Sequence, residues 1–222
     1  MTSLTFLGAK DEIGNIRTFV FDKPDKAWRP GQYQKYVLPN VVGDDDAKTR
    51  YFTIASAPSE NVVHISTRVS DSAFKQALNA LKPGEQIEVE ELDGDFTWDD
   101  DTRVVLVAGG IGVTPYRSFL VERAASSKAI PAHLLYFGRD ENFAFKAEFD
   151  SIAAGHPELT VDYVVGEQIS AENIIAKAPE SAGQVVYLSG PEGLVDAVGE
   201  DLTKRGVSIK QDWFPGYTEQ DY

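Results

Sequence analysis

The sequence contains no cysteine, only three histidines, and no long apolar run. Without cysteine the chain can form no disulfide, no thiolate zinc site, no iron–sulfur cluster of its own and no thiol nucleophile. His64, His133 and His156 share no short spacing typical of metal ligands. No stretch approaches the roughly 20 apolar residues of a membrane span, and the N-terminus lacks a signal-peptide pattern. We therefore expect a cytoplasmic protein without a metal site.

Basic residues are also scarce, with 21 Lys and Arg against 35 Asp and Glu and a formal net charge of -14. This balance argues against binding to nucleic acid or to an anionic membrane surface. The hydrophobic content of 42% is typical of a globular chain and not of a disordered acidic one. A length of 222 residues allows one large domain or two compact ones.

Residues 1–99 consist mostly of short apolar segments separated by turn signals, such as Gln86–Glu90 after Lys82-Pro-Gly84. This spacing is typical of an antiparallel barrel or sandwich. Residues 71–81 differ, because their apolar side chains recur at helical spacing, with Asp71 or Ser72 as the N-cap. We predict a first domain, residues 1–99, with an antiparallel sheet and one helix.

The pattern changes near residue 100, where the continuous apolar run Val104–Ala108 predicts a buried parallel strand. Helices and strands then alternate to the C-terminus, which predicts a doubly wound parallel sheet in a second domain, residues 100–222. The expected helices are 115–125, 145–154, 171–176 and 192–204, and the further strands are 133–137, 160–165, 184–188 and 207–210.

Two glycine turns follow predicted strands of this second domain. The first, Gly109–Pro115, joins a strand to a helix, the context in which backbone amides bind phosphate. Its pattern is G-x-G-x-x-P, and Gly138-Arg139 occupies the place of the usual ribose-binding acid. The second turn is Ser189–Glu192. Each could be a plain strand–helix turn, but together at one sheet edge they favour a nucleotide site.

Several motifs resemble the ferredoxin–NADP reductase superfamily over nearly the whole chain. They are Pro30-Gly-Gln-Tyr33, Arg50-Tyr-Phe-Thr53, Gly109–Pro115 and Ser189-Gly-Pro-Glu192. The resemblance implies a Greek-key, flavin-binding antiparallel barrel followed by a doubly wound nicotinamide-nucleotide domain. It also implies hydride transfer from NADH or NADPH to FAD, and electron transfer to a separate acceptor such as ferredoxin, flavodoxin or a small oxidant.

The resemblance assigns flavin roles to the first domain. Arg50 would meet the flavin phosphates, Phe52 would lie against the isoalloxazine ring, and Thr53 would bond near its reactive nitrogen. Phe52 stands where the family has Tyr, so a phenol hydrogen bond to the flavin is lost. Tyr51 is a candidate flavin-binding residue that could replace this bond, although it should point to the opposite strand face. Residues expected along the flavin are Ile65, Ser66, Thr67 and Arg68. Ser72, which could also be a plain N-cap, would meet a pyrophosphate at a helix N-terminus, favouring FAD over FMN.

In the second domain the resemblance assigns residues to the nicotinamide nucleotide. Those expected to border it are Gly110, Gly112, Thr114, Pro115, Gly138, Arg139, Gly190, Pro191 and Glu192. Ser189 stands where the family often has Cys, close to the hydride path. NADPH-dependent members commonly carry Ser-Arg where this chain has Gly166-Glu167. Glu167 would repel a 2'-phosphate and suits free ribose hydroxyls, so NADH is favoured, although Arg139 and Lys146 could meet a phosphate.

The last twelve residues are rich in aromatics. By resemblance, Phe214 best matches an aromatic that covers the flavin, with Tyr217, Trp213 or Tyr222 as alternatives; the tail could also simply pack on the barrel. We thus expect Thr53, Ser189 and Phe214 at the reacting centre.

The expected partners are a nicotinamide nucleotide and a redox protein or small acceptor, and the expected state is a monomer. An acidic surface disfavours docking of an acidic ferredoxin or flavodoxin. Two alternatives remain: an electron-transfer subunit that is inactive outside a larger complex, and a flavin-free binding module.

Overall fold

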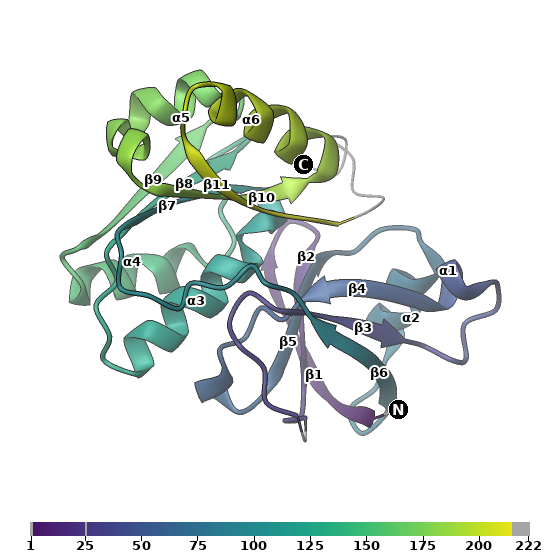
Figure 1. Cartoon of the computed structure of the whole chain (residues 1–222). Coiled ribbons are helices and arrows are strands. Elements are labelled where there is room, and N and C mark those ends of the chain that lie inside the picture. The colour runs from purple at the N-terminus through teal and green to yellow at the C-terminus, as the bar shows by residue number, and fades with distance from the viewer. Residues whose placement is uncertain (1, 25, 215–222) are drawn as a thin grey trace.

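The computed structural model describes residues 2–24 and 26–214, and this part of the chain contains two sheets (Figure 1). The first sheet is antiparallel, has six strands in the order β4-β3-β6-β1-β2-β5, and curls so that its edges approach each other. A main-chain bond of 3.0 Å from Ala55 N to His64 O links these edges. The strands are β1 (Thr2–Ile13), β2 (Ile16–Phe21), β3 (Tyr33–Val37), β4 (Thr49–Thr53), β5 (Val63–Arg68) and β6 (Gln86–Asp93).

The helical elements of this half are α1 (Asp45–Lys48), the 3-10 turn η1 (Pro58–Glu60) and α2 (Ala73–Ala80). The helix α2 confirms the helical spacing found in residues 71–81. Of the two candidate N-caps the structure uses Ser72, whose hydroxyl accepts a bond of 3.4 Å from Lys75 N. Phe74 and Leu78 on α2 are fully buried in the core of the first sheet.

The second sheet is parallel, with five described strands in the order β11-β10-β7-β8-β9. Figure 1 shows α5 and α6 on one face of it and α3 and α4 on the other. The predicted fold class, an antiparallel barrel-like sheet followed by a doubly wound parallel sheet, is confirmed. The elements are β7 (Val104–Gly109), η2 (Gly110–Val113), α3 (Thr114–Ala125), β8 (Ala132–Gly138), α4 (Lys146–Gly155), β9 (Leu159–Val165), α5 (Ala171–Lys177), η3 (Pro179–Gly183), β10 (Val185–Pro191), α6 (Glu192–Lys204) and β11 (Ser208–Phe214).

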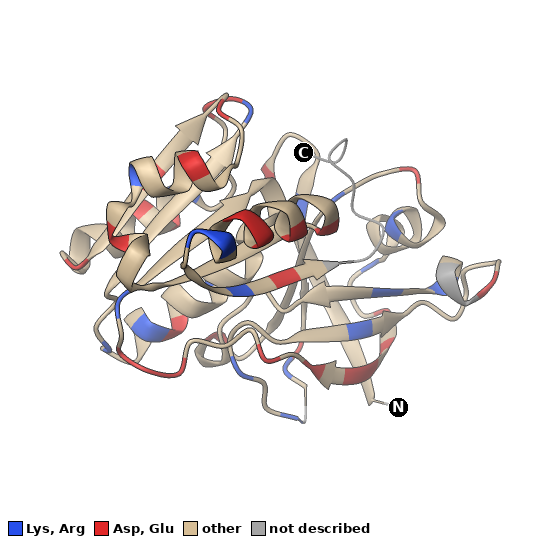
Figure 2. Cartoon of the chain, turned by 45° about the horizontal axis from the view of Figure 1, so that its top comes forward, with Lys and Arg blue, Asp and Glu red and all other residues tan. Residues whose placement is uncertain are grey.

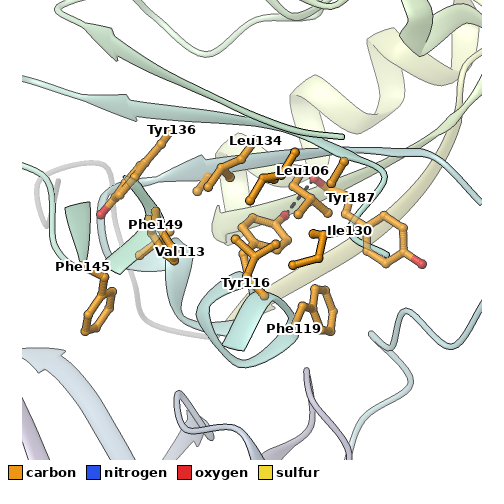
Figure 3. Packing of buried hydrophobic residues seen from close by; sticks show 14 of the residues in the cluster. Leu106, Val113, Tyr116, Phe119, Ile130, Leu134, Tyr136, Phe145, Phe149 and Tyr187 are labelled. Atoms are coloured by element: carbon orange, nitrogen blue, oxygen red, sulfur yellow. Dashed lines mark hydrogen bonds between the residues drawn. The ribbon is translucent and has the colours of Figure 1, made fainter. Parts of the chain in front are cut away.

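The apolar run that predicted a buried strand is β7, which is covered on both faces. Val104 and Leu106 pack in the cluster on the side of α3 and α4 (Figure 3). Val105 and Val107 pack in the cluster formed with α5 and α6. Successive side chains of a strand alternate between faces, so two covering layers require an unbroken apolar run.

Tyr116 of α3 bonds to two neighbouring strands at the centre of this sheet (Figure 3). Its ring is fully buried, and its hydroxyl lies 3.0 Å from Val107 O and 2.8 Å from Tyr187 O. These two carbonyl groups belong to β7 and β10, which are neighbours in the sheet. One buried hydroxyl therefore ties together the two strands between which the strand order reverses.

The C-terminal strand is longer than predicted. β11 runs from Ser208 to Phe214 and pairs with β10 as far as Pro191. Trp213 and Phe214, which the sequence assigned to a tail, thus belong to the sheet, because parallel pairing with β10 continues to satisfy their backbone groups. Tyr217 and Tyr222 lie outside the described residues.

The segment 94–103 between β6 and β7 packs on the second sheet. Phe96 stacks on Phe119 of α3 at a centroid distance of 6.0 Å, and the Arg123 guanidinium lies 3.9 Å from the Trp98 ring centroid. The domain boundary near residue 100 stays a prediction. Asp and Glu residues are spread along both halves of the chain (Figure 2). Among the described residues, no helix has the length and apolar character needed to cross a membrane.

We predict that Gly31 is indispensable for joining the halves. Its φ is +88°, and a Cβ there would lie 1.9 Å from Phe96 O and 2.7 Å from a Phe119 ring carbon. Gly14 is the matched control, since its φ is +55° and a Cβ would meet nothing within 4 Å. Gly14→Ala should cost about 1–2 kcal/mol through backbone strain alone. Gly31→Ala should lower the free energy of unfolding in urea by at least about 2 kcal/mol more; equal effects would refute the close packing.

Candidate functional site

The two glycine turns lie side by side at the point where the strand order of the second sheet reverses. The chain leaves β7 toward β8 on one side, while β10 and β11 lie on the other. A Cβ on Gly112 would lie 2.4 Å from Ser189 O and 3.0 Å from the Gly190 Cα. Glycine is therefore required at position 112 by the contact between the turns. In open parallel sheets, ligands bind in the crevice at such a reversal.

Thr53, Ser189 and Asp212 form a buried polar cluster where the two sheets meet. They come from β4, β10 and β11, and each is at most 8% exposed. Ser189 and Asp212 are register partners, and the Ser189 hydroxyl lies 3.4 Å from the Asp212 Oδ2. The Thr53 hydroxyl also faces the Asp212 carboxyl. The structure thus brings together Thr53 and Ser189, as the resemblance implied, and adds an acid between them.

Burial raises the pKa of Asp212 to about 7, with a smaller contribution from the charge of Asp95. Hydrogen bonding from Ser189 and Thr53 opposes that rise, because both hydroxyls favour the ionised carboxylate. A carboxyl with a pKa near neutrality can hold or release a proton under ordinary conditions. This makes Asp212 the titratable group best suited to chemistry in the cluster.

A cavity of about 680 Å³ lies between the β1–β2 hairpin and the carboxyl ends of β8 and β9; Gly110 of the first glycine turn lines it, but Thr53, Ser189 and Asp212 do not. Five of the residues predicted to bind cofactors line it: Arg68, Gly110, Gly138, Arg139 and Glu167. Glu167 forms an ion pair of 2.8 Å with Lys177. Lys146, which was expected near a nucleotide phosphate, does not line this cavity; its ammonium pairs with Asp150 at 2.8 Å.

The aromatic residues of the Arg50–Thr53 motif point to opposite faces of β4. Phe52 is 7% exposed and packs against Tyr36 and Phe74 in the core. Tyr51 is 38% exposed, and its hydroxyl donates to Glu91 over 2.8 Å. Most of the Phe52 ring is thus occupied by core contacts, and its stacking on a flavin stays a prediction. Arg50 lies at the start of the motif and donates to Thr49 O over 2.7 Å.

The residues expected along the flavin differ in what their side chains contact. Ile65 is in the core, and the Ser66 hydroxyl lies 2.7 Å from the Thr18 hydroxyl. Thr67 is also buried. Arg68 alone of this group lines the cavity, and its Nη1 donates to Asn15 over 3.2 Å. Side-chain contact with a ligand in the cavity therefore falls to Arg68.

The residues expected around the nicotinamide lie at the ends of β7 and β10. Thr114 and Pro115 open α3 and are buried, and the Thr114 hydroxyl donates to Ile111 O over 3.2 Å. Gly190 and Pro191 end β10, and Glu192 opens α6. Phe214 is the register partner of Pro191 and ends β11. Their contacts with a nucleotide stay predictions, and Tyr217 lies outside the described residues.

Comparison with known proteins supports one superfamily. The family model for the oxidoreductase NAD-binding domain matches residues 106–200. An NAD(P)H-flavin reductase of Aliivibrio fischeri is 27% identical over 219 residues, covering 90% of each protein. Ferredoxin–NADP reductase B of Sorangium cellulosum is 34% identical over 154 residues, covering 65% of this chain and 61% of the relative. The chain is therefore similar to oxidoreductases of the ferredoxin–NADP reductase superfamily.

Other superfamily relatives are longer. A flavohemoprotein of a Burkholderia species is 29% identical over 199 residues, which is 83% of this chain and 50% of that protein. The chain spans about half the length of the flavohemoproteins it matches. The fold is shared with the FAD/NAD-binding domain of a nitric oxide dioxygenase from Vibrio cholerae, at a TM-score of 0.77 and 20% identity, covering 96% of this chain and 98% of that domain.

The superfamily residues of the first sheet fit a polar cofactor such as FAD. Arg68 Nε is buried and has no hydrogen-bond partner among the described residues. A buried polar atom without a partner costs about 1–3 kcal/mol, which a bound ligand with matching groups would recover. The N-terminus of α2 at Ser72 adds free backbone amides of the kind that bind phosphate.

Asp212 is the functional residue that the motifs did not indicate. Nothing in its neighbourhood forms a motif, and the sequence placed it in a tail. The apolar and polar alternation of Val207–Lys210 stops at Gln211, which is polar, so the sequence carried no signal that the strand continues to Asp212. Its partner Ser189 follows only from the pairing register of β10 and β11.

We predict that Asp212→Asn changes stability in a pH-dependent way. Because the pKa is raised in the folded protein, Asp212 contributes stability that is fully present below pH 3.8 and is lost as the pH rises through about 7. The variant should therefore match the native protein near pH 4 and become more stable than it by up to about 4 kcal/mol at pH 8. Urea unfolding of the ligand-free proteins at pH 4, 6 and 8 measures this. A stability difference that does not vary with pH would show that Asp212 is ionised throughout.

Proposed function

We propose that the chain oxidises NADH by hydride transfer to bound FAD and passes the electrons to a separate acceptor. The observation that supports this most directly is the buried cluster of Thr53, Ser189 and Asp212, which joins the flavin-type sheet to the nucleotide-type sheet. The cluster is buried where the two sheets meet, and the glycine turn that contacts Ser189 also lines a large cavity. This is the expected setting for chemistry between two bound molecules.

Each sheet contributes residues that hold one molecule. Arg50 and the α2 N-terminus at Ser72 would bind the flavin phosphates, and Thr53 would bond the ring system. The turns at Gly110 and Gly190 would hold the nicotinamide nucleotide, because their backbone allows close approach. FAD, when bound, supplies an acceptor for a hydride that can release electrons singly. The protein's own task is to bind the two molecules, to orient them and to exclude water from the space between them.

Asp212 would accept and donate a proton beside the reacting groups. Its Oδ2 faces the Ser189 hydroxyl, and its pKa of about 7 lets it hold a proton or release one near neutral pH. Burial of the cluster keeps bulk water away, so the carboxyl and the two hydroxyls are the groups available to accept or donate a proton there.

The preference for NADH over NADPH is supported by the charges in the cavity. Glu167 lines it and would repel a 2'-phosphate, while its ion pair with Lys177 keeps that lysine occupied. Lys146 is held by Asp150 outside this cavity. Arg68 and Arg139 remain as cations in the lining, and they suit the pyrophosphate that both nucleotides share.

A second candidate is an electron-transfer component that works only within a larger assembly. The longer relatives favour it, as does a 26% identical match to the toluate 1,2-dioxygenase electron transfer component of Pseudomonas putida, which covers 82% of this chain and 56% of that protein. The net charge of -14 and the acidic side chains on both halves would favour a basic partner (Figure 2).

The deciding experiment is anaerobic titration of the purified, FAD-loaded chain with NADH and with NADPH. NADH should bleach the flavin absorbance rapidly and NADPH more slowly, and NADH-dependent dye reduction should be steady in the isolated chain. A chain that binds no FAD would contradict the proposal and favour a flavin-free binding module. Bleaching without turnover of a dye would favour the assembly-dependent component.

We predict that Glu167→Ser shifts the nucleotide preference toward NADPH. The change removes a repelling charge and releases Lys177 to meet a 2'-phosphate. The ratio of kcat/KM for NADPH to that for NADH should rise about tenfold, which corresponds to about 1.4 kcal/mol. Glu172→Ser, an exposed acid on the neighbouring α5 that does not line the cavity, is the control and should leave the ratio unchanged. A rise in both variants would point to overall charge instead.

A further inference from the structure

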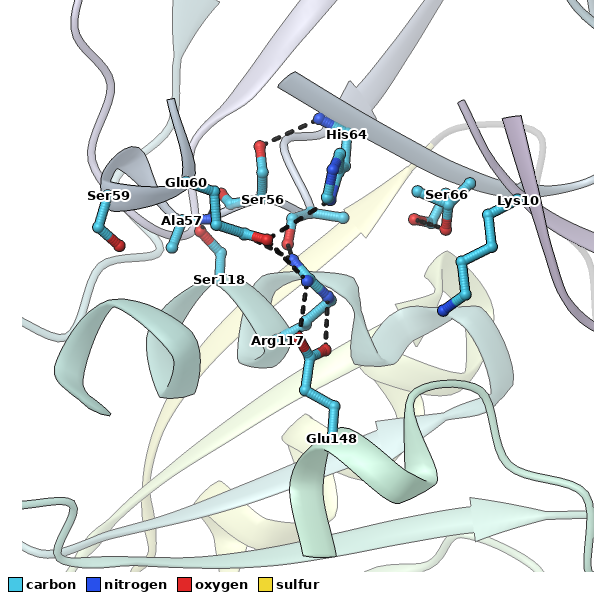
Figure 4. Close-up of polar contacts among 12 residues, drawn as sticks. Lys10, Ser56, Ala57, Ser59, Glu60, His64, Ser66, Arg117, Ser118 and Glu148 are labelled. Atoms are coloured by element: carbon cyan, nitrogen blue, oxygen red, sulfur yellow. Dashed lines mark hydrogen bonds and ion pairs between the residues drawn. The ribbon is translucent and has the colours of Figure 1, made fainter. Parts of the chain in front are cut away.

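Arg117 on α3 uses its whole guanidinium in bonds to three separate segments (Figure 4). The side chain is 6% exposed. Nη1 donates to Ala55 O over 2.9 Å and to Glu60 Oε2 over 2.8 Å, while Nη2 donates to Glu60 Oε1 over 2.9 Å. Nη2 and Nε contact the two carboxylate oxygens of Glu148 at 2.8 Å each. A guanidinium has five N–H donors, so each has a contact.

Arg117 and two of its partners, Ala55 and Glu148, lie near residues of the proposed reaction. Arg117 lies one helical turn after Thr114, at the start of α3. Ala55 comes two residues after Thr53, at the exit from β4. Glu148 is in the first turn of α4, which follows the loop that bears Gly138 and Arg139. One side chain therefore connects the flavin strand, the helix that begins beside the nucleotide turn, and the cavity wall.

Two further bonds extend this contact along the same helix. The Ser118 hydroxyl donates to Ser56 O over 2.7 Å, and the Glu122 carboxylate accepts from Ser59 N over 2.9 Å. α3 thus holds the residues that follow β4 at three successive points. Of the three residues that make these contacts, Arg117 lies closest to the start of α3, and it also bonds to α4.

The charges around Arg117 favour a fixed arrangement. Burial alone would raise the pKa of Glu60, but the hydrogen bonds and charge of Arg117 bring it below its ordinary value, so Glu60 stays ionised. Burial and then the charge of Arg117 lower the pKa of the neighbouring His64 to about 4, so its ring is neutral near pH 7. A buried guanidinium paired with carboxylates is costly to separate, since removal of one partner leaves an unpaired buried charge.

The backbone conformation of Phe145 brings its ring against the Arg117 guanidinium. Phe145 has a φ of +62°, a left-handed conformation that is uncommon for a bulky residue and costs of order 1–2 kcal/mol. In this conformation its buried ring lies 5.4 Å from the Arg117 guanidinium carbon. A strained residue held against the guanidinium indicates that the surrounding packing fixes this geometry firmly.

We propose that Arg117 is a positioning residue that fixes β4 and its Thr53 relative to the start of α3, and so sets the rate of hydride transfer without touching either reacting molecule. The proposal rests on the proposed function. A planar fork fixes orientation as well as distance, which a lysine ammonium does not. Small displacements of reacting groups reduce rates strongly, by about a hundredfold for 1 Å.

The test compares Arg117→Lys with Arg123→Lys. Arg123 is a matched control, because it is a buried arginine on the same helix, paired with Asp101 and packed on Trp98, away from the cluster. The rate of flavin reduction at saturating NADH should fall at least about tenfold in Arg117→Lys, while the dissociation constant for NADH should stay within about twofold. Arg123→Lys should lower the urea midpoint without changing the reduction rate.

A second measurement needs no flavin or nucleotide. Since the chain has no cysteine, Leu7→Cys on β1 and Ala197→Cys on α6, both exposed, give a single pair of spin labels across the two sheets. The label distance distribution in the ligand-free protein should broaden with Arg117→Lys and stay narrow with Arg123→Lys. If Arg117→Lys fails to fold, Glu60→Gln, which weakens the same contact, decides the question with the same measurements.

The outcomes separate this proposal from the proposed function. If the native protein does not reduce bound flavin with NADH, the proposed function is overturned and the positioning role with it. If the native protein reduces flavin and Arg117→Lys does so at the same rate with an unchanged label distance, only the positioning role is overturned. A broadened distance together with a slower reduction step and an unchanged NADH affinity supports it.

Discussion

The structure depends on the reversal of strand order between β7 and β10. Both faces of the parallel sheet are covered by helices, so its strands are apolar along their length and polar chemistry is confined to their ends. At the reversal, the turns after β7 and β10 lie side by side and lead to helices on opposite faces of the sheet, the arrangement that forms a ligand crevice in open parallel sheets. The close approach of Gly112 to the Ser189 carbonyl group sets how near the two turns lie. The first sheet then closes this crevice by bringing Thr53 to Ser189 and Asp212.

Much of this arrangement could be predicted from local sequence. Each pattern that allows this depends only on which faces of a single strand or helix are buried. Examples are the alternation of apolar residues, the run Val104–Ala108 and the helical spacing of residues 71–81. Asp212 and Arg117 could not be recognised in this way, because their roles depend on partners far apart in the chain. The Ser189–Asp212 pair needs the register of β11, and the contacts of Arg117 need the two halves to be docked. The left-handed Phe145 is likewise a result of packing, since its sequence neighbours give no turn signal.

The acidity of the protein also has a structural component. Arg117 and Arg123 are buried, and their charges are used to fasten α3 to its surroundings. Lys177 and Lys146 are committed to Glu167 and Asp150. Each of these four cations is paired with at least one carboxylate, so the pairs neutralise acidic groups as well as basic ones and leave the excess of Asp and Glu on both halves. Association with a basic electron acceptor should therefore weaken as ionic strength rises.

The buried hydroxyl of Tyr116 has a mechanical consequence. It ties Val107 and Tyr187, so β7 and β10 are joined by more than their ladder of backbone bonds. The crevice cannot widen by separation of these two strands without breaking that tie. The joint between the sheets combines the ion pairs and hydrogen bonds of Arg117 with the apolar packing of Ile16 and Phe96 on the second sheet. A nucleotide that enters the crevice would then meet two sheets that cannot separate internally and whose relative position is set by this joint.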